Sequence, residues 1–264
     1  MSLKHFLTWI ALGLAAMLAG CGQGKLSLTL AGSTAFQPFA EKLAEQYMVI
    51  HPETNITVQG GGSALGIQSA LSGAAGIGMA DLVELPREAR ELSRAIVARD
   101  GIAVVIHPAN PVSDLTVAQV RDIFNGQLSN WSAIGGADHP VTVVSREAGS
   151  GTRSSFEQII TGIRLTPNAL VQDSNGTIRE TVANDQNAVG YLSHGLLSDR
   201  IKAVTIDGQE CTTENVVSGR YPLVRPIFLL TRGTPGGEAK KFIDYVLSAE
   251  GQATIKADGL IPAK

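Results

Sequence analysis

Residues 26–81 read LSLTLAGSTAFQPFAEKLAEQYMVIHPETNITVQGGGSALGIQSALSGAAGIGMAD, and this stretch decides the fold. It repeats one unit, which is a short apolar strand, a turn rich in Gly and Ser, and a helix. We expect strands at 26–30, 56–59 and 75–79, and helices at 36–49 and 64–71. Strands that alternate with helices in this way predict an α/β fold, in which helices cover the faces of a sheet.

The same alternation continues to the C-terminus. We expect further strands at 102–106, 141–144, 188–192, 203–206 and 227–231, and further helices at 116–124, 150–160, 174–183, 238–247 and 249–257. Two proline-rich stretches, His107–Pro111 and Tyr221–Pro226, interrupt the pattern and suggest two stiff crossings between lobes. We therefore predict a first lobe of residues 25–106 plus 224–264 and a second lobe of residues 107–223, with a ligand cleft between them.

The N-terminal segment is predicted to be a targeting signal that is not part of the fold. Lys4 and His5 precede the apolar run Phe6–Leu18, and Leu18-Ala19-Gly20 leads directly to Cys21, which is typical of a secretory signal. Because Cys21 stands where a bacterial lipobox places its cysteine, we predict a lipoprotein signal peptide at 1–20, lipidation of Cys21 and a short tether at 21–24. An ordinary signal peptide cut nearby, or an uncleaved anchor helix, is the alternative.

Composition and charge narrow the classes of function. Of the 264 residues, 44% are hydrophobic, which is enough to build a core. The net charge is −3, and removal of residues 1–20 with Lys4 makes it more negative by one charge. A negative chain argues against a nucleic-acid partner, which needs a basic field. Taken alone, the same charge would also argue against an anionic ligand.

Motifs for catalysis, metal binding and disulfides are not found in the sequence. There is no nucleotide P-loop and no nucleophile elbow. His51, His107, His139 and His194 are scattered without the spacing of metal ligands. Cys211 would have no partner once Cys21 is lipidated, so we expect no disulfide. We therefore predict a protein that is not an enzyme and that carries no metal and no cofactor.

Three turns carry the candidate chemistry: Ser33-Thr34, Ser63 and Ser150-Gly151-Thr152. Each lies between an expected strand and an expected helix. The N-terminal end of a helix presents unpaired N–H groups and about half a positive charge, and glycines let the backbone approach an oxyanion closely. One such turn is ordinary helix capping, and Ser63 is the expected N-cap of its helix. Three such turns in one chain favour an oxyanion site.

Two charged residues narrow the kind of anion. Arg146 ends a strand shortly before Ser150, where a guanidinium suits bidentate capture of a tetrahedral oxyanion. The alternative for Arg146 is a surface salt bridge with Glu147 or another acid. Asp81 also follows a strand, and an ionised carboxylate can accept the proton that phosphate keeps near neutral pH. Fully ionised sulfate has no such proton, so the sequence favours phosphate, unless Asp81 is only the N-cap of the next segment.

A likeness to a known family runs in order through nearly all of the chain after residue 24. Its motifs are the turns Gly32–Pro38, Gly60–Ser63 and Ser145–Arg153, and the stretches Asp173–Gly176, Ala188–Tyr191 and Tyr221–Pro226. In these motifs the chain resembles the phosphate-binding proteins of bacterial high-affinity phosphate ABC transporters. The resemblance implies a two-lobed periplasmic-binding-protein fold of type II-like form, with two crossings between the lobes.

The resemblance also implies a set of ligand residues. Those that match the family's motifs are Ser33, Thr34, Ala35 (through its N–H), Ser63, Asp81, Arg146, Ser150, Gly151 and Thr152. One departure concerns the arginine. Some members have an Asp two residues after it, which orients the guanidinium, where this chain has Ala148. Glu147 or another acid would have to take that role.

The sequence thus predicts an extracytoplasmic, lipid-anchored monomer that captures inorganic phosphate. As the resemblance implies, its partners would be an ABC permease and the ATPase that drives it. Two alternatives stay open, a binding protein for another oxyanion such as molybdate, tungstate or sulfate, and a phosphate sensor or surface protein without a role in transport. An extracytoplasmic phosphatase would in addition have to turn over a phosphate ester.

Overall fold

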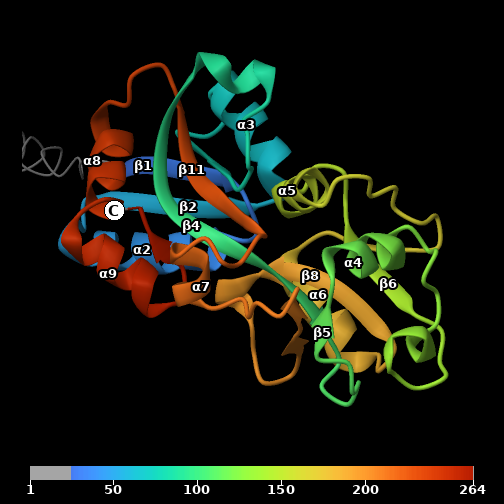
Figure 1. Ribbon diagram of the computed structural model, residues 1–264. Coiled ribbons are helices and arrows are strands. Elements are labelled where there is room, and N and C mark those ends of the chain that lie inside the picture. The colour runs from blue at the N-terminus through green and yellow to red at the C-terminus, as the bar shows by residue number, and fades with distance from the viewer. Residues whose placement is uncertain (1–24, 264) are drawn as a thin grey trace, which may run out of the picture.

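One mixed β-sheet runs through residues 25–263, the part of the chain that the computed structural model describes. The strands lie in the order β2-β1-β3-β11-β4-β8-β6-β7, and the sheet passes from one lobe into the other (Figure 1). The predicted signal peptide at 1–20, the lipidation of Cys21 and the tether at 21–24 lie outside the described residues. Among residues 25–263, no helix is long and apolar enough to cross a membrane.

The first lobe contains the repeat of strand, turn and helix that the sequence predicts. β1 (Leu26–Gly32) pairs in parallel with β2 (Thr54–Gly60) on one side and β3 (Ile77–Ala80) on the other. The helices of this lobe are α2 (Gln37–Ile50), α3 (Gly62–Ser72), α8 (Gly237–Val246) and α9 (Ala249–Ala257). α2 buries Phe39, Leu43 and Tyr47, which are spaced at four residues and so share one face.

In the second lobe the same sheet continues with further parallel strands. β6 (Thr142–Arg146) pairs in parallel with β7 (Leu170–Gln172) and β8 (Ala188–Ser193). Its main helices are α4 (Val117–Phe124), α5 (Gly151–Ile159) and α6 (Asn175–Asn184). The short elements of the two lobes together are η1 (Arg87–Glu91), β5 (Asp114–Leu115), η2 (Trp131–Ile134), η3 (His194–Leu196), β9 (Lys202–Ala203), β10 (Thr205–Ile206), α7 (Thr213–Val217) and β12 (Ile261–Pro262).

Two long strands connect the lobes. β4 (Leu92–Ile106) pairs antiparallel with β11 (Val224–Arg232) as far as Gly101, and with β8 from Ile102 onward. Figure 1 shows β4, in green, running from the upper lobe into the lower one. Val97 and Ala98 pack in the core of the first lobe, whereas all five residues of 102–106 pack in the core of the second.

The proline-rich stretches therefore do not mark the residues at which the chain passes from the core of one lobe to the core of the other. The sequence placed the strand 102–106 in the first lobe, but those residues are the end of a 15-residue strand and belong to the second core. The first part of β4 shows no apolar strand pattern in the sequence, because Arg94, Arg99 and Asp100 interrupt its apolar residues. β11 likewise begins before the predicted residue 227 and includes Pro226, close to a shift in its register with β4.

Most predicted helices lie within two residues of the observed ones. Thr116 caps α4, as predicted, and Gln119 completes a capping box with it. Ser150 caps α5 by accepting a hydrogen bond from the N–H of Arg153. β7 was missed because three residues, Leu170–Gln172, are too short to show a period. Cys211 is buried and forms no disulfide within residues 25–263.

α3 can lie against β1 and β3 only because residue 66 has no side chain. A Cβ at Gly66 would come within 2.4 Å of the Met79 carbonyl oxygen and 2.9 Å of the Ala31 carbonyl oxygen. Both are backbone atoms of the sheet, so neither can move aside cheaply. Since α3 carries Ser63 at its N-terminal end, this packing also sets the position of a candidate site residue.

We predict that Gly66→Ala lowers the free energy of unfolding by roughly 1–3 kcal/mol, the usual cost of overpacking. Urea denaturation of the variant and the parent measures the difference. Gly176→Ala, also in a helix, is the matched control, because the nearest atom to its new Cβ is Ser174 Oγ at 3.7 Å. A Gly66→Ala variant as stable as the control would contradict the close packing of α3.

Candidate functional site

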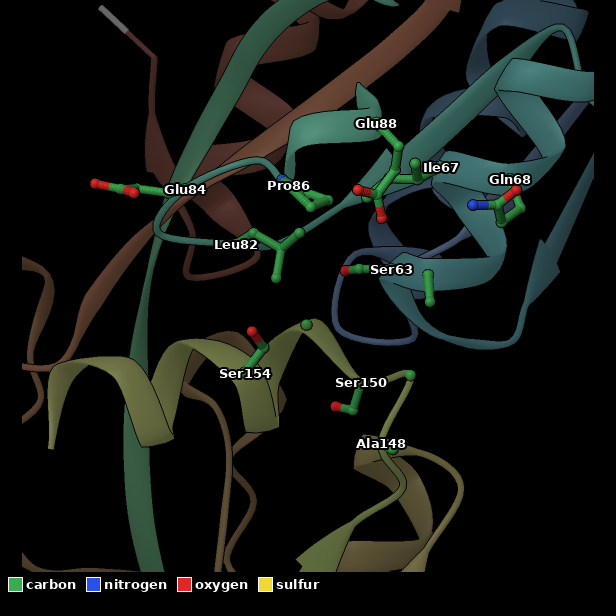
Figure 2. Close-up of a pocket in the computed structure, with 13 residues that line it drawn as sticks. Ser63, Ile67, Gln68, Leu82, Glu84, Pro86, Glu88, Ala148, Ser150 and Ser154 are labelled. Carbon is green, nitrogen blue, oxygen red and sulfur yellow. The ribbon is translucent and has the colours of Figure 1, made fainter. Parts of the chain in front are cut away.

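The candidate residues gather where the two lobes meet. Asp81 directly follows β3, Arg146 ends β6, and the helices α3, α5 and α6 all begin nearby. A pocket of about 180 Å³ opens beside this meeting point, and Ser63, Ser150 and Gly151 are among the residues that line it, whereas Asp81 and Arg146 are not. Figure 2 shows Ser63 on the α3 side of this pocket and Ser150 on the α5 side.

The first turn is held by its own serine. Ser33 is fully buried, and its Oγ accepts hydrogen bonds from the N–H groups of Ala35 and Phe36, at 3.2 Å each. Thr34 is partly exposed, and its Oγ1 accepts a hydrogen bond from Asn175 Nδ2 at 3.1 Å. Thr34 therefore faces the second lobe, while Ser33 shapes the turn. Contact of the Ala35 N–H with a ligand stays a prediction.

Ser63 is not the N-cap that the sequence predicted. α3 begins at Gly62, and its N-cap is Gly61 with a φ of 137°, a conformation that side chains disfavour. Ser63 instead lies in the first turn, where its Oγ donates a hydrogen bond to Asp81 Oδ1 at 2.6 Å. Ser63 Oγ in turn accepts a hydrogen bond from the backbone N–H of Asp81 at 3.0 Å. Ser63 thus holds the carboxylate rather than the helix.

Asp81 connects the two lobes. Its Oδ2 accepts a hydrogen bond from Thr152 Oγ1 at 3.0 Å, and its backbone carbonyl accepts one from Ser155 Oγ at 3.1 Å. Both partners lie on α5 in the second lobe. No helix starts directly after Asp81, since η1 begins only at Arg87. The alternative that Asp81 is merely an N-cap is therefore wrong.

The third turn comes close to Asp81 because residue 151 is glycine. A Cβ on Gly151 would lie 2.1 Å from Ser63 Oγ and 2.5 Å from Asp81 Oδ1. Any side chain there would push α5 away from the first lobe. Gly151 therefore permits the close contact of α5 with the first lobe, and Ser150, buried just before it, caps the helix.

The salt bridge with Glu147 that was the alternative for Arg146 is present, but the side chain is buried rather than on the surface, with 1% of its area exposed. Its Nε and Nη2 each donate a hydrogen bond to the carboxylate of Glu147 at 2.9 Å, and Nη2 also donates one to the Asp173 carbonyl at 3.2 Å. Glu147 thus orients the guanidinium where this chain has Ala148. The remaining nitrogen, Nη1, is buried with no hydrogen-bond partner among the described residues. A buried donor without an acceptor is costly, so Nη1 is available to a ligand.

Two further residues of the site were not predicted. Asn175 begins α6 and binds Thr34 across the cleft, and Arg225 on β11 lies 3.0 Å from Asp81. Both stand in stretches that carry the family likeness, Asp173–Gly176 and Tyr221–Pro226. Nothing in those stretches alone shows which side chain turns toward the cleft.

The arrangement is suited to a small oxyanion. The N-terminal ends of α3 and α5 meet at Asp81, and the N-terminal end of α6 reaches Thr34. Each end offers N–H groups and a positive dipole. The guanidinium of Arg146, paired with Glu147, keeps one donor nitrogen without a partner among the described residues. Asp81 supplies an acceptor, which an anion that carries a proton can use.

The fold and the site define a two-lobed substrate-binding protein. A family model described as a PBP superfamily domain matches residues 19–250. The chain is 35% identical over 241 residues to the phosphate-binding protein PstS of Bacillus subtilis, covering 89% of this chain and 80% of the relative. The chain therefore belongs to the PBP superfamily and, within it, to the family of the PstS proteins.

Solved structures agree with this assignment. The chain is similar to a substrate-binding protein from Clostridium perfringens with bound phosphate, with a TM-score of 0.86 and 39% identity over 90% of this chain and 100% of that one. It is also similar to an ABC-type phosphate transport receptor from Vibrio cholerae. There the TM-score is 0.74 and the identity 36%, over 89% of this chain and 99% of that one.

The strand that carries Arg146 is supported by a buried tyrosine. Tyr191 stacks on Phe156 with a centroid separation of 4.1 Å, and its hydroxyl lies 2.8 Å from Ser145 Oγ. Burial raises the pKa of Tyr191 from 10.0 to about 12. Between these two values the unfolded chain has lost a proton that the folded chain keeps. The contribution of the Tyr191 hydroxyl proton to the free energy of unfolding is therefore complete below pH 10 and is lost as the pH rises toward 12.

We predict that the free energy of unfolding falls less steeply between pH 10 and 12 in Tyr191→Phe than in the parent. A shift of about two pKa units corresponds to roughly 2–3 kcal/mol over that window. Urea denaturation at several pH values measures both slopes. Loss of the hydroxyl's contact with Ser145 shifts the variant's free energy of unfolding by the same amount at every pH and does not change the slope. A slope equal to the parent's would mean that Tyr191 does not titrate as described.

Proposed function

We propose that this chain is an extracytoplasmic solute-binding protein that captures inorganic phosphate between its lobes and delivers it to an ABC permease and its ATPase. The observation that carries the proposal is the unpartnered Nη1 of the buried Arg146, at the end of the strand before α5, whose Thr152 donates a hydrogen bond to the buried carboxylate of Asp81. The names of the relatives support it, since PstS of Bacillus subtilis is a phosphate-binding protein. The proposed activity is reversible binding without turnover.

Phosphate would be held from both lobes at once. Thr34, Ser63 and Asp81 belong to the first lobe, and Arg146 with residues 150–152 belongs to the second. A charge-assisted hydrogen bond from Arg146 is stronger than a neutral one, and exclusion of water by closure strengthens both kinds. The proton that phosphate retains would be donated to Asp81. Sulfate would face the same carboxylate with no proton to donate, so that two acceptors would meet without a hydrogen bond between them. A binding site rejects a ligand that leaves its buried polar groups unpaired in this way.

The lipid anchor and the monomeric state are part of the proposal. Cleavage after Gly20 and acylation of Cys21 would hold the lobes at a membrane surface, within reach of a permease. The support for the anchor is the sequence Leu18–Cys21. Mass spectrometry of the protein purified from membranes tests it, because a diacylated N-terminal cysteine has a defined mass.

We predict that Arg146→Ala and Ser150→Ala each weaken phosphate binding by about 2–4 kcal/mol, because each leaves charge on the ligand under-satisfied. Isothermal titration calorimetry measures the dissociation constants. Arg200→Ala is the matched control, since Arg200 is half exposed and pairs with Glu180 on the surface of the same lobe. Arg146→Ala binding phosphate as tightly as the control would show that the site is assigned wrongly.

Asp81→Asn is predicted to relax discrimination against sulfate. An amide can donate a hydrogen bond to a fully ionised oxyanion, which a carboxylate cannot. We expect the ratio of the sulfate to the phosphate dissociation constant to fall at least tenfold, about 1.4 kcal/mol. Competition calorimetry checks this, with Asp138→Asn as the control because Asp138 lies outside the cleft and pairs with Asn130. Unchanged selectivity in Asp81→Asn would rule out the proton-acceptor role.

A further inference from the structure

A second buried guanidinium lies behind the site. Arg225 is on β11, one of the two strands that connect the lobes, and none of its surface is exposed. Its Nη1 lies 3.0 Å from Asp81 Oδ2, and its Nη2 donates a hydrogen bond to Asp100 Oδ2 at 2.8 Å. One cation therefore lies between two buried carboxylates. The family motifs that assigned the ligand residues gave no role to it.

Arg225 is itself held in place by the sheet. It stands opposite Asp100 in the register of β11 and β4. Asp100 is fully buried, and its Oδ1 accepts a hydrogen bond from Ser193 Oγ of the second lobe at 2.9 Å. Burial raises the pKa of Asp100, and the neighbouring Arg225 acts against that rise. The guanidinium thus has a fixed anchor on one side and Asp81 on the other.

The polar contacts continue from this anchor back to the cleft. The N–H of Ser193 donates a hydrogen bond to Asn175 Oδ1 at 3.1 Å, and Asn175 Nδ2 donates one to Thr34 Oγ1 at 3.1 Å. The chain of contacts that starts at Asp81 therefore ends at another candidate ligand residue. It includes Arg225 and Asp100 on the connecting strands and then passes through the end of β8 and the start of α6 to the turn after β1.

Asp81 depends on Arg225 for its counter-charge. Its other close partners, Ser63 and Thr152, are neutral hydroxyls. Nη1 of Arg225 has no hydrogen bond among the described residues, so its contact with Asp81 is ionic rather than a directed bond. A buried carboxylate without a cation tends to take up a proton and become neutral. A neutral carboxyl can donate a hydrogen bond, and it then no longer rejects a fully ionised anion.

We propose that Arg225 is the positioning residue for Asp81 and thereby determines the choice of phosphate over sulfate. It supplies the counter-charge that keeps the carboxylate an acceptor, and Asp100 and Ser193 fix where that charge lies. The inference rests on the proposed function, because it concerns the proton of bound phosphate. Arg225 acts through Asp81, whereas Arg146 contacts the ligand itself.

Two substitutions separate charge from geometry. Arg225→Gln removes the charge, and Arg225→Lys keeps it on a compact group that cannot span both carboxylates. The ratio of the sulfate to the phosphate dissociation constant is expected to fall at least tenfold in Arg225→Gln. In Arg225→Lys it should lie between that value and the parent's. Arg220→Gln is the matched control, because Arg220 is half exposed and pairs with Glu214 near the same crossing, and its ratio should equal the parent's.

The outcomes are distinguishable. Arg225→Gln could weaken the binding of phosphate and of sulfate by the same factor, or leave both unchanged. The ratio of the sulfate to the phosphate dissociation constant would then stay within twofold of the parent's. That result overturns the inference and leaves Arg225 with a structural role only. If the parent itself binds no phosphate, the proposed function fails instead. Competition calorimetry gives the ratios, and melting curves establish that each variant is folded.

The parent provides a test that needs no variant. In protein labelled with ¹⁵N-arginine, saturation with phosphate should shift the side-chain Nε–H resonance of Arg225, because the ligand changes the surroundings of Asp81. The resonance of Arg220 should stay in place. If the Arg225 resonance does not move on saturation with phosphate, the coupling between Arg225 and Asp81 does not exist and the inference falls, even where the variants fail to fold.

Discussion

The buried carboxylate of Asp81 is the contact on which the packing of the two lobes against each other depends. It is 2% exposed and accepts hydrogen bonds from Ser63 of its own lobe and Thr152 of the other. Burial of a charge is costly unless it is paired and hydrogen-bonded. The residues around it follow from that constraint, since Gly151 lets the second lobe approach and Arg225 brings a counter-charge.

The same constraint explains how a negatively charged protein can hold an anion. The net charge of −3 belongs to the whole chain, while the cleft gathers N-terminal ends of helices and the buried guanidinium of Arg146. Neutral donors and oriented dipoles stabilise an oxyanion without formal charge. In the proposed function the buried carboxylate of Asp81 serves selectivity, because a ligand that carries a proton can donate it there and a fully ionised one cannot. The overall charge is thus a poor guide to the ligand.

Local patterns in the sequence predicted the fold well, and contacts between distant segments less so. Strand, Gly/Ser turn and helix leave clear periods, and Thr116 and Ser150 cap helices as their positions suggest. Ser63 was misplaced because Gly61 takes a positive φ and starts the helix earlier. Arg225 reaches Asp81 only through the pairing of strands far apart in the chain, and no short motif records that pairing.

Calorimetric titration of the chain with phosphate, arsenate and sulfate tests the central claim most directly, namely that a buried carboxylate selects an oxyanion that carries a proton. Phosphate and arsenate both keep a proton near neutral pH and should compete for one site per chain. Sulfate in large excess should displace neither. Binding of sulfate as tight as that of phosphate, at the same site, would contradict the account.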